Sequence, residues 1–102
     1  MNKLIDTIHD RATLLAHVEG ILEQCRYDTH LVDGTTTTLA AAIAPNGHVL
    51  AVGMSATVFP DMFDAAAGVQ YAIADAKTKA RQALFETVTY QMRSERVQTA
   101  GE

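Results

Sequence analysis

The feature that most constrains the fold of this chain is its last forty residues, which contain no proline after Pro60. Small and apolar residues recur there at helical spacing and predict one long helix over residues 61–94. Asp61 and Asp64 are typical of the start of such a helix. Thirty residues of helix span about 45 Å. Because that exceeds the comfortable width of a globule of about 100 residues, the helix is expected to project or to pack on a second copy.

A row of small residues runs along this predicted helix. Glycine or alanine occupies every fourth position, and a leucine follows, so the row comprises Gly68, Ala72, Ala76, Ala80 and Leu84. Small side chains let another backbone approach to the near end of the usual interaxial range. The row either lies on the chain's own hairpin or forms a helix–helix seam with a second copy. The second interpretation makes these five residues the predicted oligomer interface.

Residues 37–57 are predicted to form an antiparallel β-hairpin. Two apolar runs flank Pro45-Asn46-Gly47-His48. Asn-Gly between apolar runs is a strong hairpin marker, because both residues tolerate the positive φ that a type I′ turn needs twice. Gly53, inside the second run, predicts a bulge or the close approach of another backbone.

The N-terminal residues 1–25 are predicted to be an amphipathic helix. Apolar side chains recur at spacings of three and four, at Leu4, Ile8, Leu15, Val18, Leu22 and Cys25. Between this helix and the hairpin, Tyr27, Thr29 and Leu31 alternate with polar positions, which fits a third short strand as well as a loop. Residues 97–102 are predicted to be a flexible tail.

These elements predict a single α+β domain over residues 1–102. With 48% hydrophobic and 20% charged residues, the chain can form a packed core. One hairpin must nevertheless cover the apolar faces of two helices, and an isolated two-stranded hairpin is marginally stable. Pairing of sheet edges across a two-fold axis would enlarge the sheet and bury the remaining apolar surface. The sequence therefore predicts a homodimer or a higher even oligomer.

Charge is unevenly distributed along the chain. The net charge of −4 argues against attraction to nucleic acid or to an anionic membrane. Residues 1–76 carry a balance of −6, whereas residues 77–96 carry +3. The basic stretch either pairs with the acidic front or forms an anion-binding surface. In the second case the predicted ligand-binding residues are Lys77, Arg81 and Arg93.

The sequence offers few groups for catalysis or metal binding. Asp6, His9 and Asp10 share one face of the predicted first helix, where a solvated acidic surface is favoured over a metal site. Cys25 lies on the apolar stripe, which favours a buried thiol over a nucleophile. There is no glycine-rich phosphate loop. These observations predict a protein that is not an enzyme and uses no cofactor and no metal.

Several features follow one another in a fixed order: Asn46-Gly47 in the hairpin, Gly53-Met54-Ser55-Ala56, Phe63-Asp64, and then Gly68, Ala72 and Ala76. In this order and spacing, the segment from Thr38 to about Tyr90 resembles the phage gene-49/gene-66 (Gp49-like) family of small uncharacterised tailed-phage proteins. The chain departs from the family pattern at Val69-Gln70, where the family carries basic residues, and at Leu84-Phe85, where it often carries a tryptophan.

The resemblance implies a phage or prophage accessory protein, present in the host bacterial cytoplasm, with no catalytic residues to transfer. Two functions are compatible with it. The first is a host-defence inhibitor that sequesters an anionic nucleotide-type ligand between subunits. The second is a structural or assembly module that contacts another phage or host protein and holds no small ligand.

Overall fold

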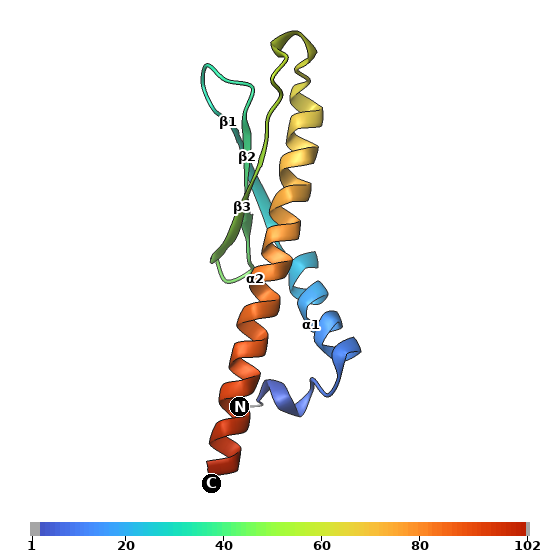
Figure 1. The fold of residues 1–102 in the computed structure, drawn as a ribbon, viewed down its shortest axis with the longest axis vertical. Helices are drawn as coiled ribbons and strands as arrows, with labels where there is room; N and C mark the ends of the chain where they lie inside the picture. The colour runs from blue at the N-terminus through green and yellow to red at the C-terminus, as the bar shows by residue number, and fades with distance from the viewer. Residues whose placement is uncertain (1–2, 102) are drawn as a thin grey trace.

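The long helix dominates the molecule. The computed structural model describes residues 3–101, and α2, Ala65–Gly101, runs through almost the whole of it (Figure 1). At 1.5 Å per residue, α2 is about 55 Å long, and the molecule measures 62 × 22 × 20 Å. Its radius of gyration is 17.5 Å, against about 13 Å for a compact domain of 100 residues. The chain is therefore strongly elongated.

The predicted long helix is confirmed, with different ends. A short 3₁₀ turn, η2, Pro60–Met62, precedes it. Asp64 then caps α2, since its carboxylate accepts a hydrogen bond from the backbone N–H of Ala67 at 3.1 Å. At the other end, residues 97–101 are helical rather than a flexible tail, because no proline or glycine interrupts the helix before Gly101. Glu102 lies outside the described residues.

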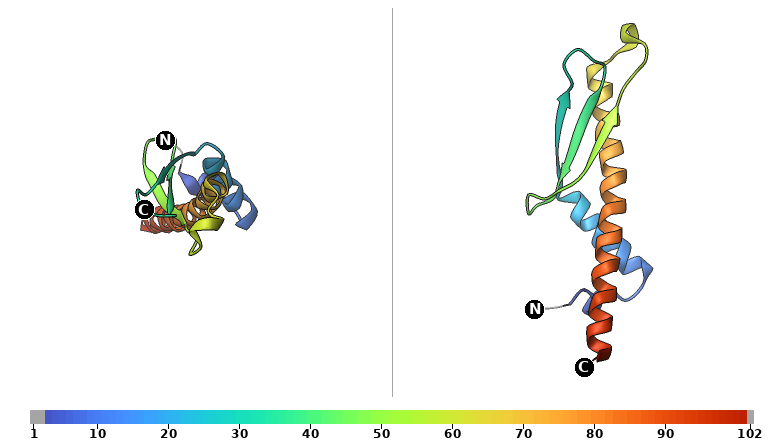
Figure 2. Two further views of the ribbon diagram at one scale, coloured as in Figure 1. Left: turned by 90° about the horizontal axis from the view of Figure 1, so that it is seen from above. Right: turned by 60° about the vertical axis from the view of Figure 1, so that its left-hand side comes forward.

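Three antiparallel strands form one sheet in the order β1-β2-β3: Arg26–Leu31, Thr38–Ile43 and Val49–Ser55. The α+β class, the hairpin and the third strand are thereby confirmed. One face of the sheet lies against the N-terminal half of α2, and β3 is the strand nearest the helix (Figure 2). A bulge falls between Ala42 and Ile43.

The hairpin turn differs from the type I′ turn that Asn-Gly predicts. Only Gly47 has a positive φ, of 87°. The Gly47 N–H donates to the Ala44 carbonyl at 2.8 Å, with Pro45 and Asn46 between them. Proline fixes φ near −65° at the second position of the turn, which suits a type I turn followed by a left-handed glycine. Pro45 therefore decides the turn type.

The N-terminal helix is shorter than predicted. Residues Leu4–Asp6 form a 3₁₀ turn, η1, and α1 spans Arg11–Glu23. The Asp10 carboxylate accepts a hydrogen bond from the Thr13 N–H at 2.9 Å, and the Asp10 N–H donates back to the Thr13 hydroxyl at 3.1 Å. This reciprocal cap starts the helix at Arg11. Residues 1 and 2 of the predicted helix lie outside the described residues.

The core lies between α2, α1 and the inner face of the sheet. Its largest fully buried side chains are Leu22 and Val18 of α1. Where α2 crosses the sheet, the core consists mainly of alanines from both elements, namely Ala40, Ala42, Ala72, Ala76 and Ala80. Farther along α2, the Ile5 N–H donates to the Glu95 carboxylate at 3.0 Å, which ties η1 to the helix.

Candidate functional site

Among the residues whose exposure the structure describes, the most exposed large apolar side chain belongs to Val58, where β3 passes into α2. Val58 is 85% exposed and Met62 is 71% exposed, and more than half the surface of Phe59 and of Tyr71 is exposed. These four residues are called the apolar tip below. The loop that carries three of them caps one end of the long axis (Figure 1).

Hydrogen bonds hold this loop in a defined shape. The Thr36 hydroxyl donates to the Thr57 carbonyl at 2.6 Å, which joins the loop to the β1–β2 connection. The Phe59 N–H donates to the Thr57 hydroxyl at 3.2 Å, and the Met62 N–H donates to the Phe59 carbonyl at 2.9 Å. The apolar side chains are thus presented on an ordered backbone rather than on a free loop.

A cavity of about 250 Å³ opens behind the tip, lined by Thr36, Ser55, Phe59, Phe63, Gly68 and Tyr71, among others. Its wall is mainly apolar, and Asp64 is the charged residue in its lining. The only charged residues between positions 58 and 71 are Asp61 and Asp64. The tip is therefore an apolar surface with an acidic border, and its cavity has room for one large side chain.

A second cavity, of about 420 Å³, lies beneath the hairpin turn. The end of α1, the turn and α2 line it, through Ile21, Gln24, Asn46, His48, Leu84 and Thr87. Its polar groups belong to three different segments, and it contains no acidic or basic side chain other than His48. This lining favours no particular chemistry.

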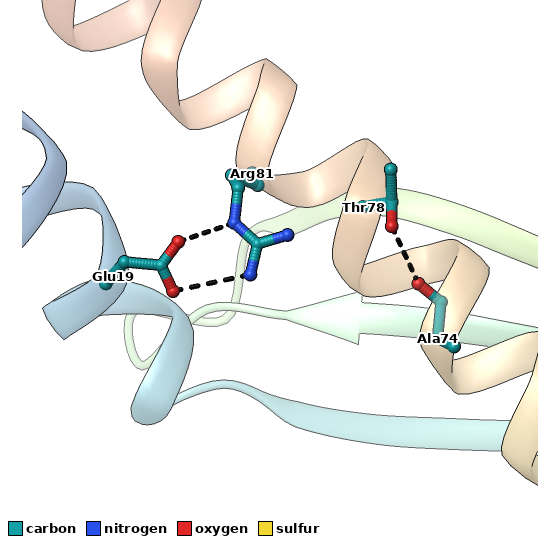
Figure 3. A network of polar contacts seen from close by, with 4 residues as sticks. All are labelled: Glu19, Ala74, Thr78 and Arg81. Carbon is teal, nitrogen blue, oxygen red and sulfur yellow. Dashed lines mark hydrogen bonds and ion pairs between the residues drawn. The ribbon is translucent and has the colours of Figure 1, made fainter.

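The structure brings only two of the three predicted anion-binding residues close together, since Lys77 lies one turn of α2 from Arg81 and Arg93 lies farther along the helix. Arg81 forms a side-on ion pair with Glu19 of α1, in which Nε donates to one carboxylate oxygen and Nη2 donates to the other at 3.3 Å (Figure 3). Lys77 and Arg93 are exposed, and twelve residues of helix separate Arg81 from Arg93 by about 18 Å. Within one chain these three residues form no common site.

The Arg81–Glu19 pair joins α2 to α1. Its hydrogen bonds lower the pKa of Glu19 and raise the pKa of Arg81. Both side chains are about two-fifths exposed, so solvent screens the attraction between them. The basic stretch thus pairs in part with the acidic front of the same chain, which is the first of the two interpretations of the charge pattern.

A second ion pair lies beside the outer edge of β3. Lys79 Nζ is 2.9 Å from the Asp75 carboxylate, and the same carboxylate oxygen accepts a hydrogen bond from the Met54 N–H at 2.9 Å. The hydrogen bond from Lys79, followed by that from Met54, lowers the pKa of Asp75. A helix side chain therefore occupies a backbone donor of the edge strand.

The row of small residues lies on the chain's own sheet. Ala72, Ala76 and Ala80 have no exposed surface and Leu84 has 7%. Opposite the row, a Cβ built on Gly53 would come within 2.2 Å of the Ala76 backbone nitrogen. Gly68 faces Thr38 of β2. The predicted seam with a second copy is therefore wrong for Ala72, Ala76, Ala80 and Leu84, since the chain itself already buries them.

Thiol and metal chemistry have little support in the described residues. The Cys25 thiol donates to the Ile21 carbonyl at 3.4 Å, and burial raises its pKa, which disfavours the reactive thiolate. Asp6, His9 and Asp10 do not share a helix face, because α1 begins only at Arg11. Residues 3–101 contain no group of three potential metal-ligating side chains. None of the described helices is long and apolar enough to span a membrane.

No protein-family model matches this chain, and comparisons with curated proteins and with solved structures find no match either. The resemblance to the Gp49-like family therefore stays a prediction. The apolar tip was not identified from the sequence as a functional surface. A signal was present, since Val58, Phe59, Met62 and Phe63 are large apolar residues that fit neither a helix nor a strand period.

Proposed function

We propose that this protein is a binding module for assembly, which self-associates and docks its apolar tip into an apolar pocket of another protein. The observation that carries the proposal is the exposure of Val58, Phe59 and Met62 on an ordered loop, beside the exposed Tyr71 of α2. Exposed apolar clusters of this kind mark interaction sites on soluble proteins. Aromatic and methionine side chains are also enriched in the buried parts of protein interfaces.

The acidic border of the tip indicates the chemistry of the partner. Asp61 and Asp64 flank the apolar residues, and no basic residue lies between positions 58 and 71. A complementary surface would present an apolar pocket edged by lysine or arginine. A side chain of the partner would enter the cavity of about 250 Å³ beside Phe63 and Tyr71. The docking is thus expected to combine apolar burial with charge complementarity at the rim.

Self-association is supported by the amount of exposed surface. The chain exposes 6996 Å², whereas a compact monomer of 11.0 kDa exposes roughly 5,600 Å². The excess is about 1,400 Å² per chain, or about 2,800 Å² for two chains, which is in the range that permanent homodimer interfaces bury. A homodimer or higher even oligomer would cover it.

Replacing both Phe59 and Met62 with serine is expected to abolish capture of the partner in pull-downs from lysogenic or infected cells. Both side chains are exposed, so the melting temperature should change by only a few degrees. Changing the similarly exposed Tyr90 and Val97 to serine provides the matched control, because both lie far from the tip on α2. Mass spectrometry identifies the captured proteins. Identical sets from the wild type and the tip variant would contradict the proposal.

Sequestration of an anionic nucleotide-type ligand between subunits, in the bacterial cytoplasm, is the second hypothesis. Its support is the resemblance together with the exposure of Lys77 and Arg93, which leaves them free to face a second copy. Titration of a panel of cyclic nucleotides in a calorimeter tests it. Binding that is lost on changing Lys77 and Arg93 to glutamine is the expected result, and an absence of heat across the panel removes the hypothesis.

A further inference from the structure

The two edges of the sheet differ in how they are covered. At the β3 edge, α2 lies alongside the strand, and the Asp75 carboxylate accepts the outward N–H of Met54. At the β1 edge, no strand pairs with β1 on its outer side within residues 3–101. Figure 2 shows β1 at the side of the sheet away from α2. Asp75 thus occupies one outward donor of the β3 edge, whereas no described strand pairs with the outer edge of β1, which is open to a further strand.

In an antiparallel sheet, successive residues of a strand point their backbone N–H and C=O groups alternately toward and away from the neighbouring strand. This alternation shows which groups of β1 point away from β2. The Val32 N–H donates to the Thr37 carbonyl at 2.9 Å, just beyond the end of β1. By alternation, the N–H and C=O groups of His30 and Asp28 also face β2. Those of Tyr27, Thr29 and Leu31 consequently point away from the sheet. Within residues 3–101, the outer edge of β1 thus presents three residues whose backbone donors and acceptors have no strand partner.

The side chains of β1 are complementary to a second copy of β1. In an antiparallel pair centred on Thr29, Tyr27 lies opposite Leu31, Asp28 opposite His30, and Thr29 opposite Thr29 of the other copy. Aromatic–aliphatic and threonine–threonine pairs are favourable across strands, and the His30 imidazole N–H can donate a hydrogen bond to the Asp28 carboxylate opposite it. The three outward-facing residues then become hydrogen-bonded pairs, which gives six new backbone hydrogen bonds.

The neighbouring register is less favourable. A pairing centred on Asp28 places the two Asp28 carboxylates opposite each other and places Arg26 opposite His30. Like charges directly opposite each other destabilise a pair of strands. The exposed Leu31 would also lose its aromatic partner. The charges of β1 therefore disfavour the register centred on Asp28.

We infer that the β1 edge is a homodimerisation surface, on which the β1 strand of a second copy pairs antiparallel about a two-fold axis at Thr29. The product is a continuous six-stranded sheet with an α2 helix over each half. The two-fold axis reverses the strand direction, so the two apolar tips lie at opposite ends of the dimer. This inference rests on the self-association proposed above, which it assigns to the β1 edge. The dimer presents two apolar tips and is therefore bivalent.

Replacing Thr29 with proline is expected to convert a dimer of about 22 kDa into a monomer of 11.0 kDa by light scattering at micromolar concentration. Proline removes the central outward N–H and inserts its ring between the strands, whereas edge strands tolerate proline where the N–H is unused. Thr29→Ala is the matched control, because it retains the N–H and should remain dimeric.

A charge exchange tests the register independently of the proline. Asp28→Lys should weaken dimerisation about tenfold, because lysine offers no acceptor for the His30 imidazole N–H and both symmetry-related pairs are lost. Adding His30→Glu should restore the wild-type dissociation constant. A monomeric wild type would overturn both this inference and the proposed self-association. A wild-type dimer that Thr29→Pro and Asp28→Lys leave intact overturns the β1 edge alone.

Discussion

Replacing Gly53 with alanine is expected to lower the free energy of unfolding by about 3 kcal/mol or more. The new Cβ would come within 2.2 Å of the Ala76 nitrogen and 2.4 Å of the Ala72 carbonyl oxygen. Overpacking typically costs about 1–3 kcal/mol. The cost here reaches the upper end, because both contacts are backbone atoms of a helix and cannot turn aside. The melting temperature should fall by roughly 12 °C or more.

Gly20 supplies the matched control for this prediction. It lies within α1, and a Cβ built there meets nothing within 4 Å. Gly20→Ala should therefore stabilise the protein by about 0.5–1 kcal/mol, through the better helix propensity of alanine. Replacement by alanine is thus expected to lower the free energy of unfolding at Gly53 and to raise it at Gly20. Equal melting temperatures for wild type and Gly53→Ala would mean that β3 and α2 are not in backbone contact.

Local patterns were sufficient to predict the elements of the fold. The hairpin follows from Asn46-Gly47 between apolar runs, and the long helix follows from the proline-free C-terminal stretch. Gly53 was correctly associated with a close backbone approach, since glycine within a strand has few other purposes. In each case the responsible interactions are close in sequence, or the residue has a single common structural role.

Boundaries depended on hydrogen bonds that the apolar periodicity does not contain. The stripe of apolar residues continues from Leu4 into α1, yet the reciprocal bonds between Asp10 and Thr13 start the helix at Arg11. Similarly, Pro45 rather than Asn46-Gly47 decided the turn type, because the ring of proline fixes φ one residue earlier. Capping chemistry competes with periodicity at each end of an element.

The candidate site was harder to predict because it depends on what remains uncovered after folding. The exposure of Val58 and Met62 depends on where the loop 56–64 lies relative to the sheet. The ion pair between Arg81 and Glu19 joins residues 62 positions apart. Because its charge is paired with Glu19, Arg81 does not add a free positive charge to the surface. No local pattern specifies either relation, since each depends on how α1, α2 and the sheet are packed.

The surface that covers the row of small residues on α2 likewise depends on how the elements pack. A substitution within the row has the second large expected effect. Replacing Ala72 with leucine should destabilise the fold by about 3 kcal/mol, because Ala72 has no exposed surface and lies against Gly53 of β3. Three additional carbon atoms cannot fit unless α2 moves away from the sheet. Thermal or urea unfolding measures the loss.

Concentration dependence separates this explanation from a seam between copies. If β2 and β3 of the same chain cover the row, the loss caused by Ala72→Leu persists at concentrations where the protein is monomeric. A seam between copies predicts instead that the variant and the wild type unfold alike at high dilution, because dilution removes the interface from both. Ala74→Leu is the control on the same helix, since Ala74 is exposed, and its effect should stay within about 0.5 kcal/mol. Equal destabilisation by both substitutions would indicate a general effect on α2 rather than its close packing on the sheet.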